Sequence, residues 1–249
     1  MELLGTSFSS FQIFLYFTCG ILIGMSKTGL SGAGLLVVPI MASLFGGKTS
    51  TGILLPILIM ADVFAVYYYH RHAQWRYIFI ALPWAVAGVI LGTLFGASVN
   101  DDLFKNILAI IILTSIGLML WLDFRSKQPT IPDTWWFGAL LGLIGGFATM
   151  VGNASGPIMA LYLLSMHLQK NSYIGTAAWF FFIINLIKVP FHVFAWHTIT
   201  PETLQINLMV LPAIGLGVIA GIKLIKLFPE KAYRYFIVFT TCLAAVFLF

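Results

Sequence analysis

The chain has 249 residues, of which 60% are hydrophobic and 8% are charged, and its net charge is +5. Soluble domains carry about 25% charged residues, so this composition excludes an ordinary water-soluble domain. The basic residues stand in short loops between apolar stretches. A nucleic-acid binder would instead cluster them on a solvated face with aromatic partners. We therefore expect a multi-pass protein of the lipid bilayer with no nucleic acid partner.

Apolar segments follow one another along the chain, and several reach the roughly 20 residues that a membrane-spanning helix needs. They are predicted at about 8–25, 30–45, 50–70, 77–98, 103–122, 135–150, 154–168, 172–196, 203–227 and 231–248. The stretch between the fifth and sixth segments concentrates charge and proline, which is typical of a linker. The predicted organisation is a first membrane repeat at 1–122, a cytoplasmic linker at 123–134 and a second membrane repeat at 135–249.

The two halves of the chain resemble each other, as copies of one unit would. The offset between matching positions rises along the chain. It is 118 for Gly24 and Gly142, 123 for Asp62 and Asn185, and 129 for Pro83 and Pro212. An odd number of segments per copy makes the second copy enter from the opposite side of the membrane, as in many secondary transporters. The predicted fold is an all-α polytopic membrane protein with two inverted repeats of about five segments each, and with broken or re-entrant helices near the start of each repeat.

The segment count distributes the basic residues unequally between the two sides of the membrane. One side receives Arg71, Arg76, Arg125, Lys127, Lys170, Lys226, Lys231 and Arg234, and the other receives chiefly Lys48 and Lys105. Cytoplasmic loops carry an excess of lysine and arginine. We therefore predict a cell inner (cytoplasmic) membrane protein with the linker in the cytoplasm and both termini outside.

Two glycine- and serine-rich stretches, at 24–34 and 145–157, interrupt apolar runs at corresponding places in the two copies. Irregular backbone at membrane depth is tolerated only where it is buried in protein or lines a wet cavity. The helix N-terminus after each break would attract an anion. The alternative is that the glycines only let helices pack closely. The predicted substrate-binding residues of the breaks are Thr28, Gly29, Ser31, Gly32, Gly152, Asn153, Ala154 and Ser155.

Ionisable residues inside apolar segments are costly and mark functional sites. Lys27 lies in the first break and is a candidate anion-binding charge, or alternatively a lysine that reaches the interface. Asp62 is a candidate coupling or gating residue, which pairs with Lys27 or Lys188 or carries a proton. Asn185, Lys188 and His192 follow at i, i+3 and i+7 and share one helix face, as a substrate site or as a hydrogen-bond network between helices. Phe147, Trp179 and Phe181 are candidates to shape the rest of a pocket.

Motifs of catalysis are absent from the sequence. There is no HExxH, no phosphate-binding loop, no paired-carboxylate metal motif and no nucleophile elbow. We expect no catalytic residue, no metal and no cofactor, and hence passive or ion-coupled transport.

The Gly24-Met-Ser-Lys27 stretch, its echo at Gly152-Asn-Ala-Ser-Gly-Pro157, and Gly175 followed by Asn185 and Lys188 together resemble the TauE/SafE family of membrane anion transporters. The resemblance covers nearly the whole chain. It implies transport of a small sulfur-containing anion, such as sulfite, a sulfonate, sulfoacetate or thiosulfate. It also implies that Lys27, Asn153, Ser155, Asn185 and Lys188 are substrate or gating positions.

Our hypothesis from the sequence is a permease that works by alternating access, with protons as an optional coupling ion. The alternatives are a passive anion channel, a transporter of a non-sulfur organic anion, a membrane enzyme or assembly factor, and a purely structural subunit. The anion, the direction of transport and the oligomeric state stay open at this stage.

Overall fold

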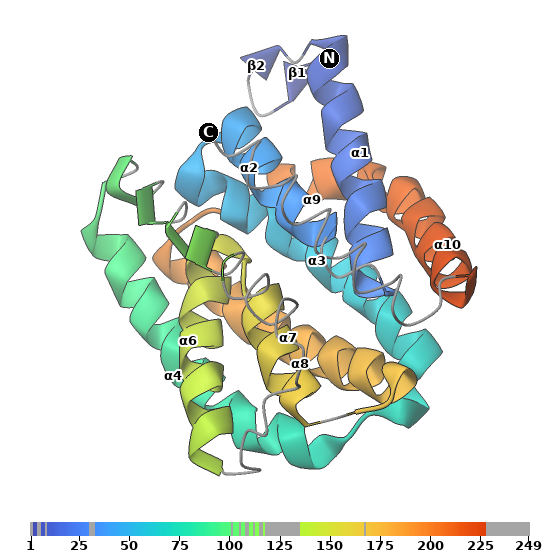
Figure 1. Ribbon diagram of the computed structural model, residues 1–249. Coiled ribbons are helices and arrows are strands. Elements are labelled where there is room, and N and C mark those ends of the chain that lie inside the picture. The colour runs from blue at the N-terminus through green and yellow to red at the C-terminus, as the bar shows by residue number, and fades with distance from the viewer. Residues whose placement is uncertain are drawn as a thin grey trace.

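The computed structural model describes residues 2–3, 6–7, 9–29, 33–100, 135–166 and 168–227, together with part of 102–117. The linker at 123–134 and the predicted segment at 231–248 lie outside the described residues. The described chain is helical (Figure 1), apart from the antiparallel pair of short strands β1 (Glu2–Leu3) and β2 (Thr6–Ser7) near the N-terminus.

The ends of the described helices agree with the predicted segments to within three residues when α8 is joined with η2 and α9 with α10. They are α1 (Ser10–Lys27), α2 (Ala33–Phe45), α3 (Gly47–Tyr69), η1 (His70–His72), α4 (Trp75–Ser98), α6 (Trp135–Gly152), α7 (Gly156–Ser165), α8 (Lys170–Pro190), η2 (Phe191–Ala195), α9 (Pro201–Met209) and α10 (Leu211–Leu227). Among the described residues, five helices are long and apolar enough to cross a membrane, and α9 with α10 forms a pair bent by 48°. The segment predicted at 203–227 is therefore broken near Val210.

The helices that follow the two breaks are short. α2 has 13 residues and α7 has 10, which at 1.5 Å per residue gives about 20 and 15 Å against a hydrocarbon core of about 30 Å. The backbone of the breaks leaves the right-handed region at Gly29, with φ of 148°, and at Asn153, with φ of 53°. Neither short helix spans the bilayer alone, as expected for broken segments.

Two helices lie side by side at the centre of the molecule, and a helix pair covers each side of them (Figure 1). α3 lies against α8 in the middle, α1 packs against α10 on one side, and α4 packs against α6 on the other. The apolar side chains form one core among α1, α2, α3 and α10 and a second among α4, α6, α7 and α8. The central pair thus separates two cores.

Close backbone contacts hold both outer pairs together, and the same contacts occur twice. Four glycines make these contacts, and a Cβ added at any of them would collide with the residue opposite. Gly20 faces Val210, Gly24 faces Ile214, Gly142 faces Ala81 and Gly146 faces Ala85. Small residues let membrane helices approach this closely. The glycines of the two helix pairs differ by 122 positions, and the residues that face them differ by 129 positions. Each contact of one helix pair therefore has a counterpart in the other.

The contacts also refine the alignment of the two halves. They match Gly24 with Gly146, which is one helical turn beyond the Gly142 that the sequence comparison matches with it. With this correspondence, the counterpart of Lys27 is Thr149, and Asp62 remains opposite Asn185.

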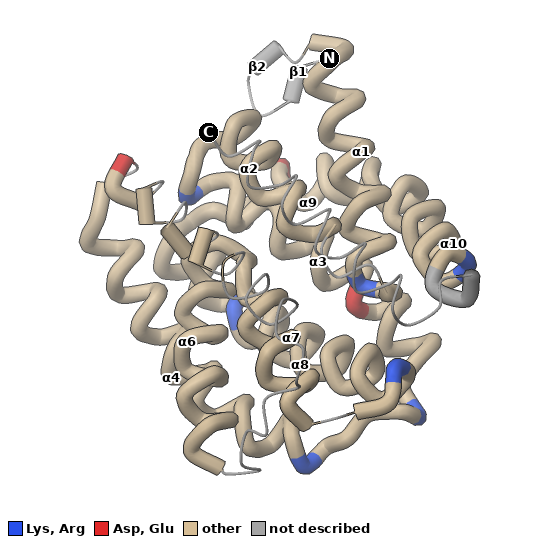
Figure 2. Tube along the Cα trace, viewed as in Figure 1, with Lys and Arg blue, Asp and Glu red and all other residues tan. Residues whose placement is uncertain are grey.

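Basic residues gather at one end of the described helices (Figure 2). Blue positions at this end lie where η1 passes into α4, where α8 begins, and near the end of α10, and a few others lie in the interior and toward the opposite end. The bond from the Gln74 amide to the Thr176 hydroxyl, at 2.9 Å, confirms that η1 and the start of α8 are neighbours. Of the residues in the predicted charge bias, Lys105, Arg125, Lys127, Lys231 and Arg234 lie outside the described part of the chain.

Candidate functional site

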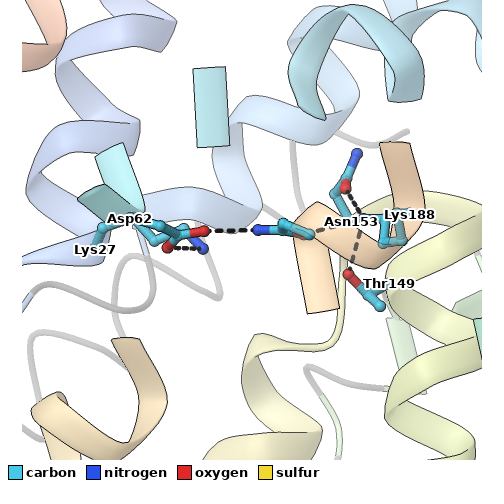
Figure 3. A network of polar contacts seen from close by, with 6 residues as sticks. Lys27, Asp62, Thr149, Asn153 and Lys188 are labelled. Atoms are coloured by element: carbon cyan, nitrogen blue, oxygen red, sulfur yellow. Dashed lines mark hydrogen bonds and ion pairs between the residues drawn. The ribbon is translucent and has the colours of Figure 1, made fainter. Parts of the chain in front are cut away.

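A chain of polar contacts crosses the centre of the molecule from the first break to the second (Figure 3). Lys27 Nζ lies 2.8 Å from Asp62 Oδ1, and Asn185 Nδ2 donates to Asp62 Oδ2 at 2.7 Å. Lys188 Nζ then donates to Asn185 Oδ1 at 3.3 Å and to Asn153 Oδ1 at 2.6 Å. Four separate segments therefore meet in one network: the end of α1, the middle of α3, α8 and the second break.

Lys188 is fully buried, and its side-chain nitrogen meets three oxygens. Besides Asn185 and Asn153, it contacts Thr149 Oγ1 at 3.1 Å. An ammonium would donate to all three oxygens, and a neutral amine would donate to the two amide oxygens and accept from the Thr149 hydroxyl. The oxygens of Asp62 face Lys27 and Asn185 instead. Among the described residues, Lys188 is thus a buried basic side chain that no carboxylate contacts.

The first break is held against α3 by two contacts. Lys27 ends α1, where a cation is favoured by the helix dipole. Its partner Asp62 lies seven residues before the end of α3, a depth of about 10 Å along that helix. Tyr69 donates its hydroxyl to the carbonyl of Thr28 at 3.3 Å. The Lys27 ammonium also lies 4.5 Å from the centre of the Phe181 ring, which adds a cation–π contact.

The second break is held by a single side chain, Asn153. Its amide donates to the Thr51 carbonyl at 3.1 Å, while its oxygen accepts from Lys188. Thr51 lies four residues after the start of α3, so this break approaches the end of α3 opposite to the first break. Asn153 adopts the left-handed backbone that asparagine tolerates better than most residues. One residue therefore ties the break to both central helices.

A cavity of about 80 Å³ lies between the two breaks. Its polar lining includes Lys27, Thr149, Asn153 and Asn185 together with Ser26 and Tyr173, and the rest is mainly apolar, including Leu58 and Phe181. A buried water needs roughly 10–15 Å³ of such space, so the cavity has room for several waters or for a small anion. The glycines contribute as well, since Gly29 and Gly156 line it and leave backbone accessible.

Apart from Thr28 and His192, the predicted site residues divide into three groups by position. Lys27, Gly29, Asn153 and Asn185 line the cavity, and Asp62 and Lys188 lie directly behind them. Gly152, Ala154 and Ser155 are buried next to the second break without lining the cavity. Ser31 and Gly32 lie outside the described residues.

The side chains of Thr28 and His192 contact other residues and do not line the cavity. Thr28 donates its hydroxyl to the Gly24 carbonyl at 2.9 Å, which closes the last turn of α1. His192 is fully buried, and its Nδ1 pairs with the Thr198 hydroxyl at 2.8 Å. It lies in the π-helical turn η2, which begins directly after Pro190. His192 therefore shares a buried helix face with Asn185 and Lys188, as predicted, but stands one turn beyond the network.

Thr149 is the residue of the polar network that the sequence reasoning did not identify. It stands four residues before Asn153 on the same face of α6, and both contact the side-chain nitrogen of Lys188. That i, i+4 spacing is the signal that could have pointed to it. Of the three aromatic candidates, Phe181 lines the cavity. Trp179 packs on Trp75, and Phe147 packs on Phe95.

The comparisons with known proteins agree with this architecture. The family model of the sulfite exporter TauE/SafE matches residues 16–248. No curated protein and no solved structure matches the chain. The matched range includes both breaks and all residues of the polar network. With its apolar helices, the chain is therefore a multi-pass membrane protein that belongs to the sulfite exporter TauE/SafE family of anion transporters.

Proposed function

We propose that this protein is a secondary transporter that moves a small sulfur-containing anion across the cytoplasmic membrane. The observation that carries the proposal is the charge balance around the cavity. Two lysines, Lys27 and Lys188, stand against one carboxylate, Asp62, in a site that is almost completely shielded from solvent. A buried charge without a counter-ion is costly, and an anion in the cavity would offset that cost.

The neutral groups of the cavity suit an oxyanion. Asn153, Asn185 and Thr149 bring amides and a hydroxyl to its wall, and Gly156 brings the start of α7, whose free N–H groups favour negative charge. Nearby, the hydroxyl oxygen of Ser155 is buried without a hydrogen-bond partner. A small movement of the second break would present this hydroxyl to a bound ligand.

Alternating access is supported by the arrangement of the two halves. We propose that 1–122 and 135–249 are inverted repeats joined by the cytoplasmic linker 123–134. The reciprocal contacts of α1 with α10 and of α6 with α4 are of the kind that a two-fold axis generates. The breaks approach α3 from opposite ends, so movement of one repeat against the other would open the cavity to either side. The basic end of the molecule would face the cytoplasm.

Asp62 is the residue through which transport would couple to protons. In its ionised form it holds Lys27 in an ion pair. A proton on Asp62 would release Lys27 toward the anion, so that proton and anion would move together. A passive channel is the competing mechanism, and it would show neither saturation nor dependence on a pH gradient.

Purified protein in proteoliposomes tests the proposal. Uptake and efflux of sulfite, thiosulfate, sulfonates and carboxylates are measured with and without a pH gradient. We expect saturable transport of at least one sulfur anion, and loss of binding and transport in Lys27→Ala and Lys188→Ala. Lys223→Ala is the matched control, because that lysine is exposed on α10 away from the cavity. Wild-type binding and transport in both cavity variants would refute the anion site.

A further inference from the structure

The two outer helix pairs each combine one helix from the first half of the chain with one from the second. α1 and α4 belong to the first half, and their partners α10 and α6 belong to the second. In both pairs, glycines on each helix bring the two backbones into contact. The closest helix packing is therefore made between the repeats and not within them.

The contact between α1 and α10 extends along more than two turns of α1. Gly24 of α1 lies against the backbone of α10. In the other direction, Gly217 of α10 lies against the Ile21 carbonyl, and Gly221 lies against Thr28. There is no room for a Cβ at these glycines, so sliding or rotating one helix against the other would bring side chains into backbone. The two helices are therefore expected to move as one piece.

The pair of α4 and α6 is built in the same way. Gly88 of α4 lies against the Leu143 carbonyl, and Gly92 lies against Met150. Gly146 of α6 lies in turn against the Ala85 carbonyl. This pair is therefore also expected to move as one piece.

Each outer pair shares an apolar core with one of the two central helices. One core joins α1, α2, α3, α9 and α10, which we call the first bundle, and the other joins α4, α6, α7 and α8, the second bundle. None of these helices contributes buried residues to both cores, and only Ala154 of the second break packs with the core of the other bundle. Units with a core of their own are able to move relative to each other.

The described chain passes between the bundles at two corresponding places. The first crossing joins α3 to α4 through the 3₁₀ helix η1, and the second joins α8 to α9 through the π-helical turn η2. Short stretches of 3₁₀ or π-helix often mark hinges or functional sites, and His197 in the second crossing has a φ of 52°. Each crossing lies against a glycine near the start of the opposite central helix, Gly52 against Thr198 and Gly175 against Ala73. Both crossings therefore have the form and the position of a hinge.

Between the crossings, the bundles meet through side chains. Asn185 of α8 donates to Asp62 of α3 at 2.7 Å, and Asn153 of the second break donates to the Thr51 carbonyl at 3.1 Å. The cavity lies at this interface, with one break in each bundle. Hydrogen bonds of side chains can be exchanged during a movement, whereas the glycine contacts within a bundle leave no space for one. The interface between the bundles is thus the part of the structure that can open.

We propose that the moving parts of this transporter are the two bundles, which turn about η1 and η2, and that the pairs α1–α10 and α4–α6 stay together throughout. The proposal rests on the proposed function, since it specifies the parts whose movement gives alternating access, with bundles that mix both repeats in place of whole repeats. Because each bundle carries one break, their rotation widens the cavity at one end and narrows it at the other.

Distances between spin labels separate movement of bundles from movement of repeats. Four exposed positions each lie on a different helix of the outer pairs: Phe14 on α1, Ile219 on α10, Leu94 on α4 and Leu140 on α6. They are replaced by cysteine two at a time and labelled, with Cys19 and Cys242 changed to alanine. Distances are measured by double electron–electron resonance in nanodiscs at pH 5 and pH 8, with and without sulfite or thiosulfate.

The pairs 14–94 and 140–219 each join the two bundles within one repeat. We expect their distances to change by at least about 3 Å between conditions, because an opening must admit at least one water molecule. The pairs 14–219 and 94–140 each join the two repeats within one bundle, and their distances should stay constant. The opposite pattern would show that the repeats move as units and would overturn the proposal.

A disulfide between α1 and α10 tests the same proposal through transport. A Cβ on Gly20 would lie 3.4 Å from the Cβ of Ala213, close to the separation of about 3.5–4.5 Å in disulfides. The variant is Gly20→Cys/Ala213→Cys, with Val210→Ala to make room and Cys19→Ala to remove the neighbouring thiol. We expect the oxidised protein to transport at the rate of its reduced form, which is the control. Transport that is lost on oxidation and restored on reduction would contradict the proposal.

The outcomes distinguish the failure of this proposal from the failure of the proposed function. If the disulfide variant does not fold, the spin-label distances decide. If no distance changes in any condition, the bundles do not move and the proposal is wrong, and anion transport by such a protein would identify a channel. If the distances follow the bundles but proteoliposomes transport no sulfur anion, the movement is established and the proposed substrate class is wrong.

Discussion

The ion pair between Lys27 and Asp62 allows a quantitative test of how the site is stabilised. Lys27→Met removes the cation and leaves Asp62, which is completely buried, with one oxygen unpaired. The carboxylate then has two options, and both are costly. Remaining charged without its partner costs about 3–5 kcal/mol. Taking up a proton costs about 1.4 kcal/mol for each pH unit above the ordinary aspartate pKa of about 3.9, or about 4 kcal/mol at pH 7.

We therefore expect Lys27→Met to lower the free energy of unfolding by about 3–4 kcal/mol at pH 7. The loss should shrink to about 1.5 kcal/mol at pH 5, because the protonated form becomes easier to reach. The sign follows from linkage: a folded state that binds the proton more strongly than the unfolded state is favoured as the pH falls. The double variant Lys27→Met/Asp62→Asn should recover most of the loss, since neither charge remains.

Unfolding of the purified protein in mixed detergent micelles, titrated with sodium dodecyl sulfate, gives the free energies at both pH values. Lys27→Met, Asp62→Asn, the double variant and the wild type form a double-mutant cycle. We expect a coupling energy of at least about 2 kcal/mol. Additive effects of the two substitutions, or a Lys27→Met loss that does not change between pH 7 and pH 5, would refute the ion pair as the source of stability.

Three further predictions concern packing and the cavity wall. Gly24→Leu should destabilise the protein by about 2 kcal/mol or more through collision with α10, whereas Gly215→Ala, which has open space around it, should melt at the wild-type temperature or above. Asn153→Ala removes the hydrogen bonds to Thr51 and Lys188 and should lower the free energy of unfolding by about 2–4 kcal/mol. Asn171→Ala, at an exposed position, is the control in the same thermal unfolding assay. Thr149→Val should weaken anion binding about three- to tenfold in calorimetry, since one of the three oxygens that meet the Lys188 nitrogen is lost; unchanged affinity would show that Thr149 plays no part in the site.

Length and apolarity were sufficient to predict the helices, because a membrane requires long apolar segments and tolerates few alternatives. The resemblance to the TauE/SafE family is likewise confirmed by the family match. The polar stripe of Asn185, Lys188 and His192 was predicted to be buried, and it is. Periodicity alone could establish this, since a lipid-facing ammonium would be far costlier than an inward one.

The partners of the charged residues could not be chosen from the sequence. Lys27 and Lys188 were both possible partners of Asp62, and only the packing of α1 against α3 decides for Lys27. Thr28 was expected to bind a ligand, but in a helix a threonine hydroxyl can instead bond the carbonyl four residues earlier, as it does here.

The correspondence of the two halves drawn from the sequence and the one drawn from the helix contacts differ by one helical turn, and this difference has a physical origin. Close helix packing requires small residues at every fourth position, and glycines at 138, 142 and 146 satisfy that spacing. Glycines spaced by four residues still align with glycines when one half is shifted by four residues, so the sequence alone does not determine the alignment. The contacts with α4 and α10 remove the ambiguity, because each glycine has a specific neighbour.

The pairing of α1 with α10 has a consequence for the synthesis of the protein. Gly24 packs against Ile214, a residue 190 positions later in the chain. At about 5–20 residues per second, the ribosome needs roughly 10 to 40 s to make that partner after α1 has been produced. During this interval the glycine face of α1 has no α10 to contact and must be covered by lipid or by the insertion machinery. Although α1 is made before the other described helices, it is therefore among the last of them to complete its packing.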